Sequence, residues 1–339
     1  MPPWGVAVGG WAGCCLRLRS ATAETSTVSH MRRFLIDTDT ASDDAVAIVM
    51  ALRAPDVHVE ALTVVAGNVA LDQAVQNALY TVEICGASVP VYRGLAKPIM
   101  RPLENAADIH GEDGMGDCGL PLAGRSPAEG RAVDVIVDTI LGSPGEITLV
   151  CLGPLTNIAA ALLRAPELAD AVERVVIMGG TGVHGPGNVS AMAEYNFWAD
   201  PEAASLVTGS GMPLEFVGWD ISITSAIKTP DRYAALEEID TPLSRFAIDV
   251  SKAVKRFADE NGMDGDDLPD PIAMAHAIDP SVSEASRLHV NVMFGDGGQR
   301  GVLEIDRMGF IGGEPNVDIV THYPSDHFFD MLFASFRNG

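Results

Sequence analysis

Four aspartates at one turn of the chain could together hold a metal ion. Residues 37–44 read DTDTASDD and follow the apolar run 34–36, which is typical of a buried strand. The apolar run 45–52 then indicates the start of a packed helix. Four carboxyl groups at such a turn repel one another and lose solvation if they are buried. A hard divalent cation with oxygen ligands would offset both costs.

Helix capping explains only part of this segment. A serine or aspartate before a helix, with more acids in its first turn, satisfies free N–H groups and the helix dipole. Capping would account for Ser42, Asp43 and Asp44. It does not account for Asp37 and Asp39, which stand at the end of the apolar run.

The surrounding pattern predicts an α/β fold with a Rossmann-like open, mostly parallel sheet and helices on both faces. We expect a single domain with a C-terminal helical insertion. The predicted strands are 34–37, 59–66, 89–93, 147–152, 175–178 and 214–218, with later strands near 288–294 and 302–305. The predicted helices are 43–53, 71–85, 129–141, 156–164, 201–209, one long helix near 243–260, and 271–277.

Several unusual residues fall where predicted strands end. Asp37 and Asp39, Asn68, Leu152 and Met178 all lie at or just past a strand's carboxyl end. In open α/β sheets, ligands bind at that edge. We therefore expect these distant residues to meet in one acidic pocket.

Further polar groups follow in two loops. Residues 188–196 carry two asparagines and Glu194, and Asp270 starts a helix after the acidic segment 264–267. Amides and carboxylates with few lysines or arginines suit a neutral polyhydroxyl ligand such as a sugar, and suit phosphate poorly. We expect residues 262–268 to form a solvated, mobile loop that closes over the site, with Asp270 alone bound to metal.

Composition narrows the possible partners. The net charge of −24 over 339 residues argues against nucleic acid and against an anionic membrane surface. No run of eighteen apolar residues predicts a membrane span. The five cysteines lack zinc-site spacing and fit a reducing compartment, so we expect a cytoplasmic protein. Residues 1–30 are expected to be a disordered or non-native N-terminal extension, with Met31 as the natural start and residues 31–339 as the functional domain.

With these motifs in view, the chain resembles the inosine-uridine-preferring nucleoside hydrolase family, calcium-dependent N-ribohydrolases with an α/β fold. The family's D-x-D-x-x-x-D-D signature matches Asp37, Asp39, Asp43 and Asp44. The match continues in order through VAGN at 65–68, HGEDGMG at 110–116, GPLTN at 153–157, VIMGG at 176–180, the 188–196 loop and Asp270-Pro271.

The resemblance implies a calcium site. Asp39, Asp44 and Asp270 would ligate Ca²⁺ together with the backbone carbonyl of Leu152. Asp39 would also be the general base that activates a calcium-bound water for hydrolysis of the N-glycosidic bond. The reaction would pass through an oxocarbenium-like transition state and would invert the anomeric carbon.

The resemblance also implies a ribose site and an oligomer. Asp43, Asn68 and Asn196 would hold the ribose hydroxyls, Asn188 and Glu194 would hold the 5′-hydroxyl, and Met178 would pack under the sugar. Asp37 would be a hydrogen-bonding support behind these groups. The substrate would be a small nucleoside, used in purine or pyrimidine salvage, and the protein a homodimer or homotetramer.

One position departs from the family pattern. Many members carry a histidine just before the last calcium-ligating aspartate, where it is thought to protonate the departing base. Here that residue is Pro269, which cannot donate a proton. His110 matches another family histidine near the base pocket and is the candidate catalytic acid. Less favoured candidates for the base pocket are Trp198, Tyr233, Phe257 and His276.

Three other functions remain open at this stage. The first is a hydrolase of a non-standard N-riboside, such as one with a modified base or nicotinamide. The second is a haloacid-dehalogenase-like phosphatase, because the strand followed by Asp37-Thr38-Asp39 also resembles that family's motif. The third is a non-catalytic calcium-binding protein of the same fold, suggested by Pro269.

Overall fold

The protein is built around one nine-stranded sheet, seen here in a computed structural model that describes residues 31–337. The strand order is β3-β2-β1-β4-β5-β6-β9-β7-β8. Pairing is parallel from β3 through to β9, whereas β7 runs antiparallel to both β9 and β8. The strands are β1 (Arg32–Thr38), β2 (Val57–Val64), β3 (Val91–Arg93), β4 (Ile147–Cys151), β5 (Arg174–Met178), β6 (Leu214–Val217), β7 (Glu284–Met293), β8 (Val302–Asp306) and β9 (Val317–His322).

The order of the strands creates a binding edge. From β1 the chain adds β2 and β3 on one side, and then β4, β5 and β6 on the other. The connections therefore diverge between β1 and β4, and a crevice forms at the carboxyl ends of these two strands. The first aspartates and Leu152 follow β1 and β4, which places them at this crevice.

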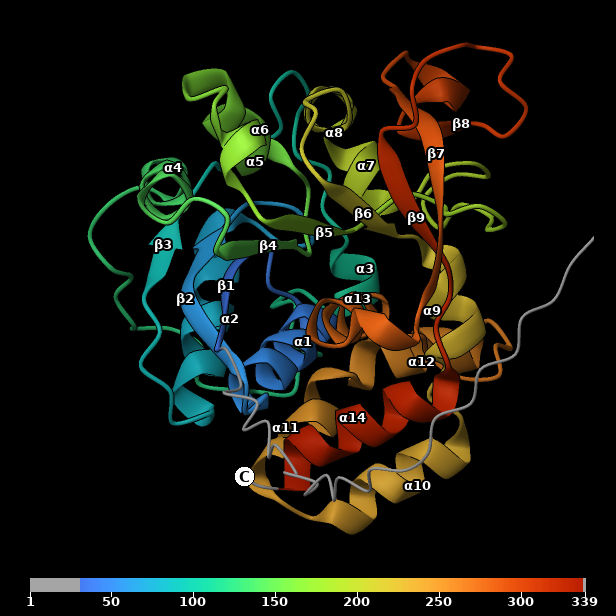
Figure 1. The fold of residues 1–339 in the computed structure, drawn as a ribbon. Coiled ribbons are helices and arrows are strands. Elements are labelled where there is room, and N and C mark those ends of the chain that lie inside the picture. Colours follow the sequence, from blue (N-terminus) through green and yellow to red (C-terminus); the bar gives the residue numbers. More distant parts are fainter. Residues whose placement is uncertain (1–30, 338–339) are drawn as a thin grey trace, which may run out of the picture. The chain divides into compact units, whose positions relative to one another are not determined.

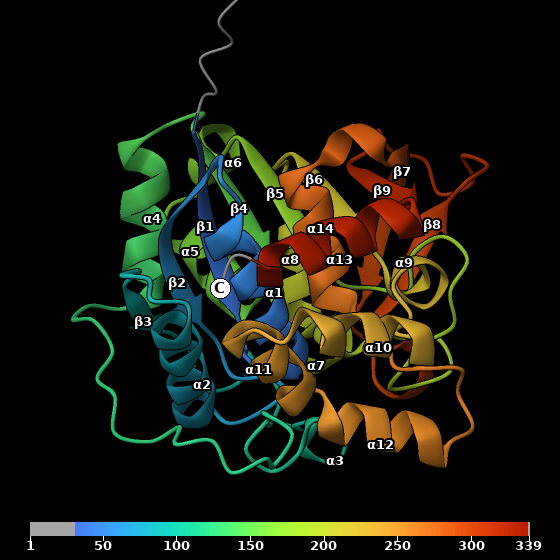
Figure 2. The same cartoon turned by 90° about the horizontal axis from the view of Figure 1, so that it is seen from below.

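Helices cover both faces of the sheet, as predicted, with α4, α5 and α8 on one face and α1, α2 and α13 on the other (Figure 1). Helices α11 and α14 pack on α1 from outside (Figure 2). The helices are α1 (Ser42–Arg53), α2 (Leu71–Ile84), α3 (Ala107–His110), α4 (Ala132–Gly142), α5 (Thr156–Arg164), α6 (Leu168–Ala171), α7 (Tyr195–Ala199), α8 (Pro201–Thr208), α9 (Trp219–Ser225), α10 (Pro230–Ile239), α11 (Pro242–Val250), α12 (Lys252–Glu260), α13 (Pro269–Ile278) and α14 (Ser325–Arg337). Within residues 31–337, none of the helices is long and apolar enough to cross a membrane.

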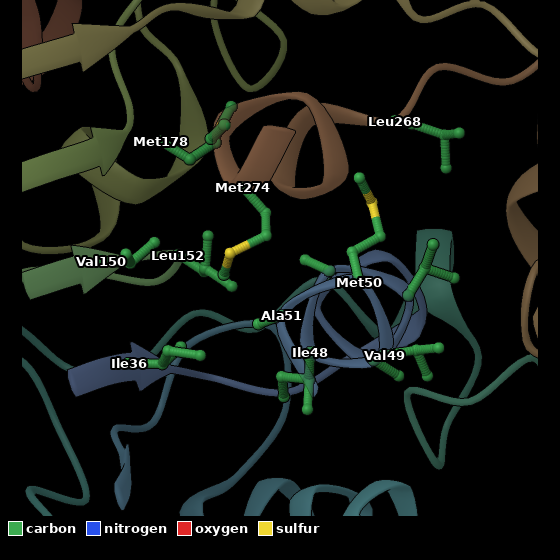
Figure 3. Packing of buried hydrophobic residues seen from close by; sticks show 14 of the residues in the cluster. Ile36, Ile48, Val49, Met50, Ala51, Val150, Leu152, Met178, Leu268 and Met274 are labelled. Atoms are coloured by element: carbon green, nitrogen blue, oxygen red, sulfur yellow. The ribbon is translucent and has the colours of Figure 1, made fainter. Parts of the chain in front are cut away.

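Strand β1 is buried on both faces, which explains its continuous apolar sequence. Phe34 and Ile36 point into the core beneath α1, and Leu35 points into the core on the opposite face. Helix α1 is apolar almost all round, because α13, α11 and α14 enclose it. Figure 3 shows Met274 pointing from α13 toward Leu152, so the core continues up to the carboxyl edge. The turn that carries the aspartates therefore rests on rigid, close-packed elements.

The predicted first six strands are confirmed to within two residues at each end. The long helix predicted near 243–260 is wrong, because two helices, α11 and α12, meet at Ser251. The Ser251 hydroxyl accepts a hydrogen bond from Lys228 Nζ at 2.7 Å and donates one to the Ala247 carbonyl. Lys228, a buried lysine distant in sequence, is thus hydrogen-bonded to the residue at which the predicted helix is interrupted. Strand β9 and helix α14 were not predicted, and the N-terminal extension proposed for residues 1–30 lies outside the described residues.

Candidate active site

The end of β1 places two aspartates with different surroundings. Asp37 Oδ2 accepts hydrogen bonds from Thr63 Oγ1 at 2.6 Å and from Asn157 Nδ2 at 2.8 Å. These bonds agree with the predicted supporting role of Asp37. Asp39 instead accepts the backbone N–H of Asn68 on Oδ2, at 2.6 Å. Burial raises the pKa of Asp37 to about 7.

Two glycines make room for Asp39. A Cβ atom at Gly67 would collide with Asp39 Oδ2, and one at Gly153 would lie 2.7 Å from Oδ1. These glycines follow β2 and β4, the two strands that flank β1. The side chain of Asp39 is therefore enclosed by backbone on both sides and held in one position.

The start of α1 brings in two more carboxylates. Asp44 Oδ1 accepts from Thr38 Oγ1 at 2.6 Å, and Asp44 Oδ2 accepts from the Ala41 N–H at 2.9 Å. Asp44 therefore caps the helix, as the capping interpretation suggested. The N-cap residue is Ala41, however, and Ser42 is the first residue of the helix. Capping and metal binding are compatible here, because each carboxylate oxygen can accept more than one bond.

Helix α13 completes the acidic cluster from the far end of the sequence. Asp270 lies in its first turn, and carboxylate oxygens of Asp43, Asp44 and Asp270 lie within 4.8 Å of one another. Asp39 is close enough that its charge raises the pKa of Asp270 further. The sequence thus correctly predicted that residues 37–44 and Asp270 meet at one edge of the sheet.

The electrostatics of this cluster fit a bound cation. Burial raises the pKa of Asp39 and Asp270 well above the usual range, and repulsion by Asp44 adds to both shifts. Burial and the neighbouring Asp43 raise the pKa of Asp44 to about 6. Within the described residues, the buried Oδ1 atoms of Asp39 and Asp43 have no hydrogen-bond partner. Oxygen donors that repel one another and lack partners are what a hard divalent metal ion requires.

The predicted backbone ligand also lies at this edge. Leu152 follows β4, and its carbonyl oxygen accepts a hydrogen bond from Asn196 Nδ2 at 2.8 Å. The same amide group donates to the Met178 carbonyl at 3.2 Å. Asn196 therefore links the residue after β4 to the last residue of β5, and the Leu152 carbonyl, with two lone pairs, keeps one for another partner.

The predicted sugar-binding residues surround the cluster in two ways. Asn68 and Asn188 line a cavity of about 530 Å³ beside Asp43. Glu194 instead caps α7, accepting the backbone N–H groups of Gly180 and Asn196 at 2.8 Å and that of Phe197. Burial raises the pKa of Glu194 to about 7.

His110 lies in the cavity wall at the end of α3. Its Nδ1 is 2.8 Å from Ser42 Oγ and 3.6 Å from Asp43 Oδ1. Burial lowers the pKa of His110 to about 4, despite the opposing effect of Asp44 and Asp267. The ring is therefore neutral near pH 7 and could donate one N–H.

Of the four less favoured candidates for the base pocket, two line the cavity and two lie elsewhere. Trp198 and Phe257 line the cavity. Tyr233 is buried, with its hydroxyl 3.1 Å from both Lys228 Nζ and Asp266 Oδ2. His276 lies near the end of α13, where its Nε2 is 2.7 Å from Glu215.

The prediction of a solvated loop at residues 262–268 is wrong for its last acids. Asp266 is 2% exposed and forms an ion pair with buried Lys228 at 2.8 Å. Asp267 accepts hydrogen bonds from Trp219 Nε1 at 2.7 Å and from Ser222 Oγ. The sequence did not reveal these partners, because they lie between β6 and α10, far from the acidic segment. An acidic segment that is exposed to solvent and one that is held by buried partners have the same local sequence pattern. The only available signal was the aromatic Trp219 directly after a strand.

Comparison with known proteins agrees with this geometry. A family model described as inosine-uridine preferring nucleoside hydrolase matches residues 34–330. The pyrimidine-specific ribonucleoside hydrolase RihB of Escherichia coli (strain K12 / DH10B) is 35% identical over 303 residues, covering 89% of this chain and 96% of RihB.

Solved structures give the same result. A plant nucleoside hydrolase, PpNRh1, superposes with a TM-score of 0.86 at 31% identity and covers 91% of this chain and 100% of its own. A purine-preferring ribonucleoside hydrolase from Gardnerella vaginalis has a TM-score of 0.83 at 29% identity, covering 91% and 98% of the two chains. The relatives differ in the base they prefer, although they share the fold.

Proposed function

This chain belongs to the inosine-uridine preferring nucleoside hydrolase family, and we propose that it works with a calcium ion and with Asp39 as the catalytic base. The reaction is hydrolysis of ribonucleosides to free base and ribose. The observation that carries the proposed mechanism is the buried group of mutually repelling carboxylates at the carboxyl ends of β1 and β4. This activity sets aside the phosphatase alternative.

Asp39, Asp44, Asp270 and the Leu152 carbonyl would hold the ion. All four are oxygen donors, as Ca²⁺ prefers. Asp43 lies in the same cluster, and we assign it to the ribose because it also lines the cavity. When bound, calcium would supply positive charge that orders the sugar hydroxyls and the attacking water.

Asp39 is suited to take the proton of that water. The Asn68 N–H fixes Oδ2, and backbone on both sides prevents the side chain from turning. Oδ1 has no partner among the described residues and is the atom we assign as proton acceptor. The surrounding carboxylates stabilise positive charge on the ribose as the glycosidic bond breaks. Because one base activates one water, the product should be the inverted α-ribose.

The remaining residues would position the sugar and the base. We assign Asn68 and Asn196 to the ribose, Asn188 and Glu194 to the 5′-hydroxyl, and Met178 to the face beneath the ring. Asn188 and Asn68 line the cavity, and Glu194 and Asn196 support its backbone from behind. His110 would donate its Nε2 proton to a neutral base while Nδ1 accepts from the Ser42 hydroxyl.

The wider assignments are also proposals. We propose that residues 31–339 form one nucleoside hydrolase domain, that the protein acts in the cytoplasm, and that it assembles as a homodimer or homotetramer. The single continuous sheet across the described residues supports the first of these.

Ribose release from a panel of nucleosides tests the proposal. Wild-type protein should release ribose in calcium buffer, lose this activity in excess chelator, and regain it when calcium returns. Asp39→Asn should lower kcat/KM by at least about 100-fold, because a general base contributes about 10²–10⁴ to the rate. The asparagine can still accept the Asn68 N–H, so the turn should remain folded.

Two outcomes would contradict parts of this proposal. Full activity in chelator would exclude the metal role. Full activity of Asp39→Asn with unchanged calcium-dependent thermal stabilisation would leave the enzyme assignment intact and move the base to another residue. A matched control is Asp264→Asn, an exposed aspartate outside the cavity, which should keep wild-type rates.

A further inference from the structure

One wall of the cavity is available for the base of the substrate. It comprises Trp219 at the start of α9, Val254 and Phe257 on α12, and Met263, Asp267 and Pro269 in the segment before Asp270; we call it the base wall. With the ribose over the acidic cluster, we place the base in the remaining cavity beside this wall. The wall is apolar and aromatic except for one carboxylate, Asp267.

Asp267 is fixed in this wall by its own hydrogen bonds. Trp219 Nε1 and Ser222 Oγ both donate to the same oxygen, Oδ2, the first at 2.7 Å. The first bond uses the indole N–H, so Trp219, which also lines the cavity, has no side-chain donor left for a ligand. Within residues 31–337, no other residue donates a hydrogen bond to the second oxygen of Asp267, and we assign that oxygen to the ligand. Asp267 is thus a preorganised acceptor.

The charges around the cavity all have one sign. The described residues that line it include five acids and no lysine or arginine. Two of the acids have cationic partners outside the lining, since Asp266 pairs with Lys228 and Glu104 pairs with Arg300. Asp267 forms no ion pair among the described residues, and its two side-chain donors are neutral; Lys228, whose charge also acts on Asp267, is paired with Asp266. A cation at the base position would therefore be attracted, and an anion would be repelled.

The chemistry of the leaving group connects these observations. A neutral base leaves with an extra electron pair and needs a proton from the protein or from water. A base with a fixed positive charge takes the same pair and leaves as a neutral molecule. The base wall offers an acceptor and aromatic faces, which stabilise cations, and Pro269 offers no donor.

We propose that Asp267 makes this enzyme selective for ribosides whose base carries a positive charge, such as a pyridinium or an N-alkylated purine. This inference rests on the proposed hydrolase function of the same site. Water adds to C1′ and the C1′–N bond breaks with its electron pair going to nitrogen. One proton passes from the water to Asp39 and then to solvent. The products are ribose, a neutral base and H⁺.

The test compares two substrates in two variants. Hydrolysis of nicotinamide riboside and of inosine is measured in calcium buffer for wild type and Asp267→Asn. The pyridinium riboside is intrinsically more labile, so the measured quantity is the change in the ratio of the two kcat/KM values. Asp267→Asn should lower this ratio at least about tenfold, because the attraction between a mostly buried carboxylate and a nearby cation exceeds the 1.4 kcal/mol that tenfold requires.

Asp264→Asn removes the same charge from an exposed position of the same segment and is the matched control. Its ratio should stay within about twofold of wild type, since exposed charges are screened. An unchanged ratio in Asp267→Asn, with inosine still hydrolysed, overturns the inference and leaves His110 as the leaving-group acid. Loss of both reactions in the wild type would instead reject the proposed function.

A second measurement uses the wild-type protein alone and does not depend on how the variant folds. 1-Methylnicotinamide carries the pyridinium charge without a ribose, and nicotinamide is its neutral counterpart. The cation should inhibit inosine hydrolysis with an inhibition constant at least about tenfold lower than that of nicotinamide. Equal inhibition by the two compounds would contradict the inference.

Discussion

The two ends of helix α13 both carry buried titratable residues, but they differ in how the charges around them are balanced. At its start, Asp270 joins carboxylates that lack a cationic partner among the described residues. Near its end, His276 contacts Glu215, and Arg174 forms two hydrogen bonds of 2.8 Å to the same carboxylate. One helix thus holds an unbalanced cluster and a balanced one.

The pKa values report this difference. Burial would raise the pKa of Glu215, but the bonds from Arg174 and His276 outweigh it and lower the pKa to about 2. At the other end nothing of that kind opposes burial, and the pKa of Asp270 lies well above its usual range. A cluster in which each charge has a partner needs no ligand, whereas an unbalanced one stores repulsion that a ligand can relieve. The comparison identifies the start of α13 as the functional end.

The largest expected effect comes from removing one charge at the functional end. Asp270→Asn should lower kcat/KM for nucleosides at least about 100-fold, because it removes a proposed metal ligand from a preorganised site. It should also abolish the rise in unfolding temperature that calcium produces. In chelator, however, the variant should unfold at a higher temperature than wild type, since one repelling charge is gone.

Ribose release and thermal unfolding with and without calcium would measure these effects. Lower stability of Asp270→Asn in chelator would break the comparison, because Asp270 would then have an unrecognised stabilising partner. Retained calcium stabilisation would remove Asp270 from the ligand set.

The opposite end should respond in stability and not in catalysis. Glu215→Gln should lower the free energy of unfolding by about 2 kcal/mol, because the positive charge of Arg174 would lose its partner in a mostly buried site. The kcat/KM of the folded fraction should stay within about twofold of wild type, because Glu215 contacts the opposite end of α13 and distant sites without shared partners are usually independent. Urea unfolding and ribose release on the same preparation would check both. A large loss of activity would mean that the two ends of α13 are coupled.

These two ends also show what the sequence can predict. The acidic turn was predictable because Asp37, Asp39 and Asp44 are close in sequence and stand after a strand. Parallel strands bring their carboxyl ends to one edge, so Asn68 could be placed there as well, whereas Asp270 was placed there by the family resemblance. The bond from Asn68 to Asp39 depends on two glycines whose fit only the packed structure shows.

The balanced groups could not be predicted, because their partners come from unrelated parts of the chain. Lys228 reaches Asp266 and Ser251 across the helices between β6 and β7. No local pattern marks such a lysine as buried, and its contact with Ser251 is also where the predicted long helix breaks. Asp267 was predicted to be solvated because its neutral hydrogen-bond donors, Trp219 and Ser222, are likewise distant in sequence. Sequence spacing thus located the unbalanced cluster, and tertiary packing alone revealed the balanced ones.

The smallest expected effect is a difference in the pH dependence of stability between two buried glutamates. Glu194, the N-cap of α7 beside the candidate site, accepts only backbone N–H groups, and burial raises its pKa to about 7. Its contribution to stability is therefore fully present below the unfolded pKa near 4.3 and is lost as the pH rises through about 7. Glu215 has a folded pKa of about 2, so its contribution is present above pH 4.3 and is lost as the pH falls toward 2.

Glu194→Gln should flatten the pH dependence of urea unfolding in chelator between about pH 5 and 7, and Glu215→Gln should flatten it between about pH 2 and 4. If both variants changed the same pH range, backbone N–H groups would balance a buried carboxylate as well as an arginine does, and the contrast between unbalanced and balanced carboxylates would fail.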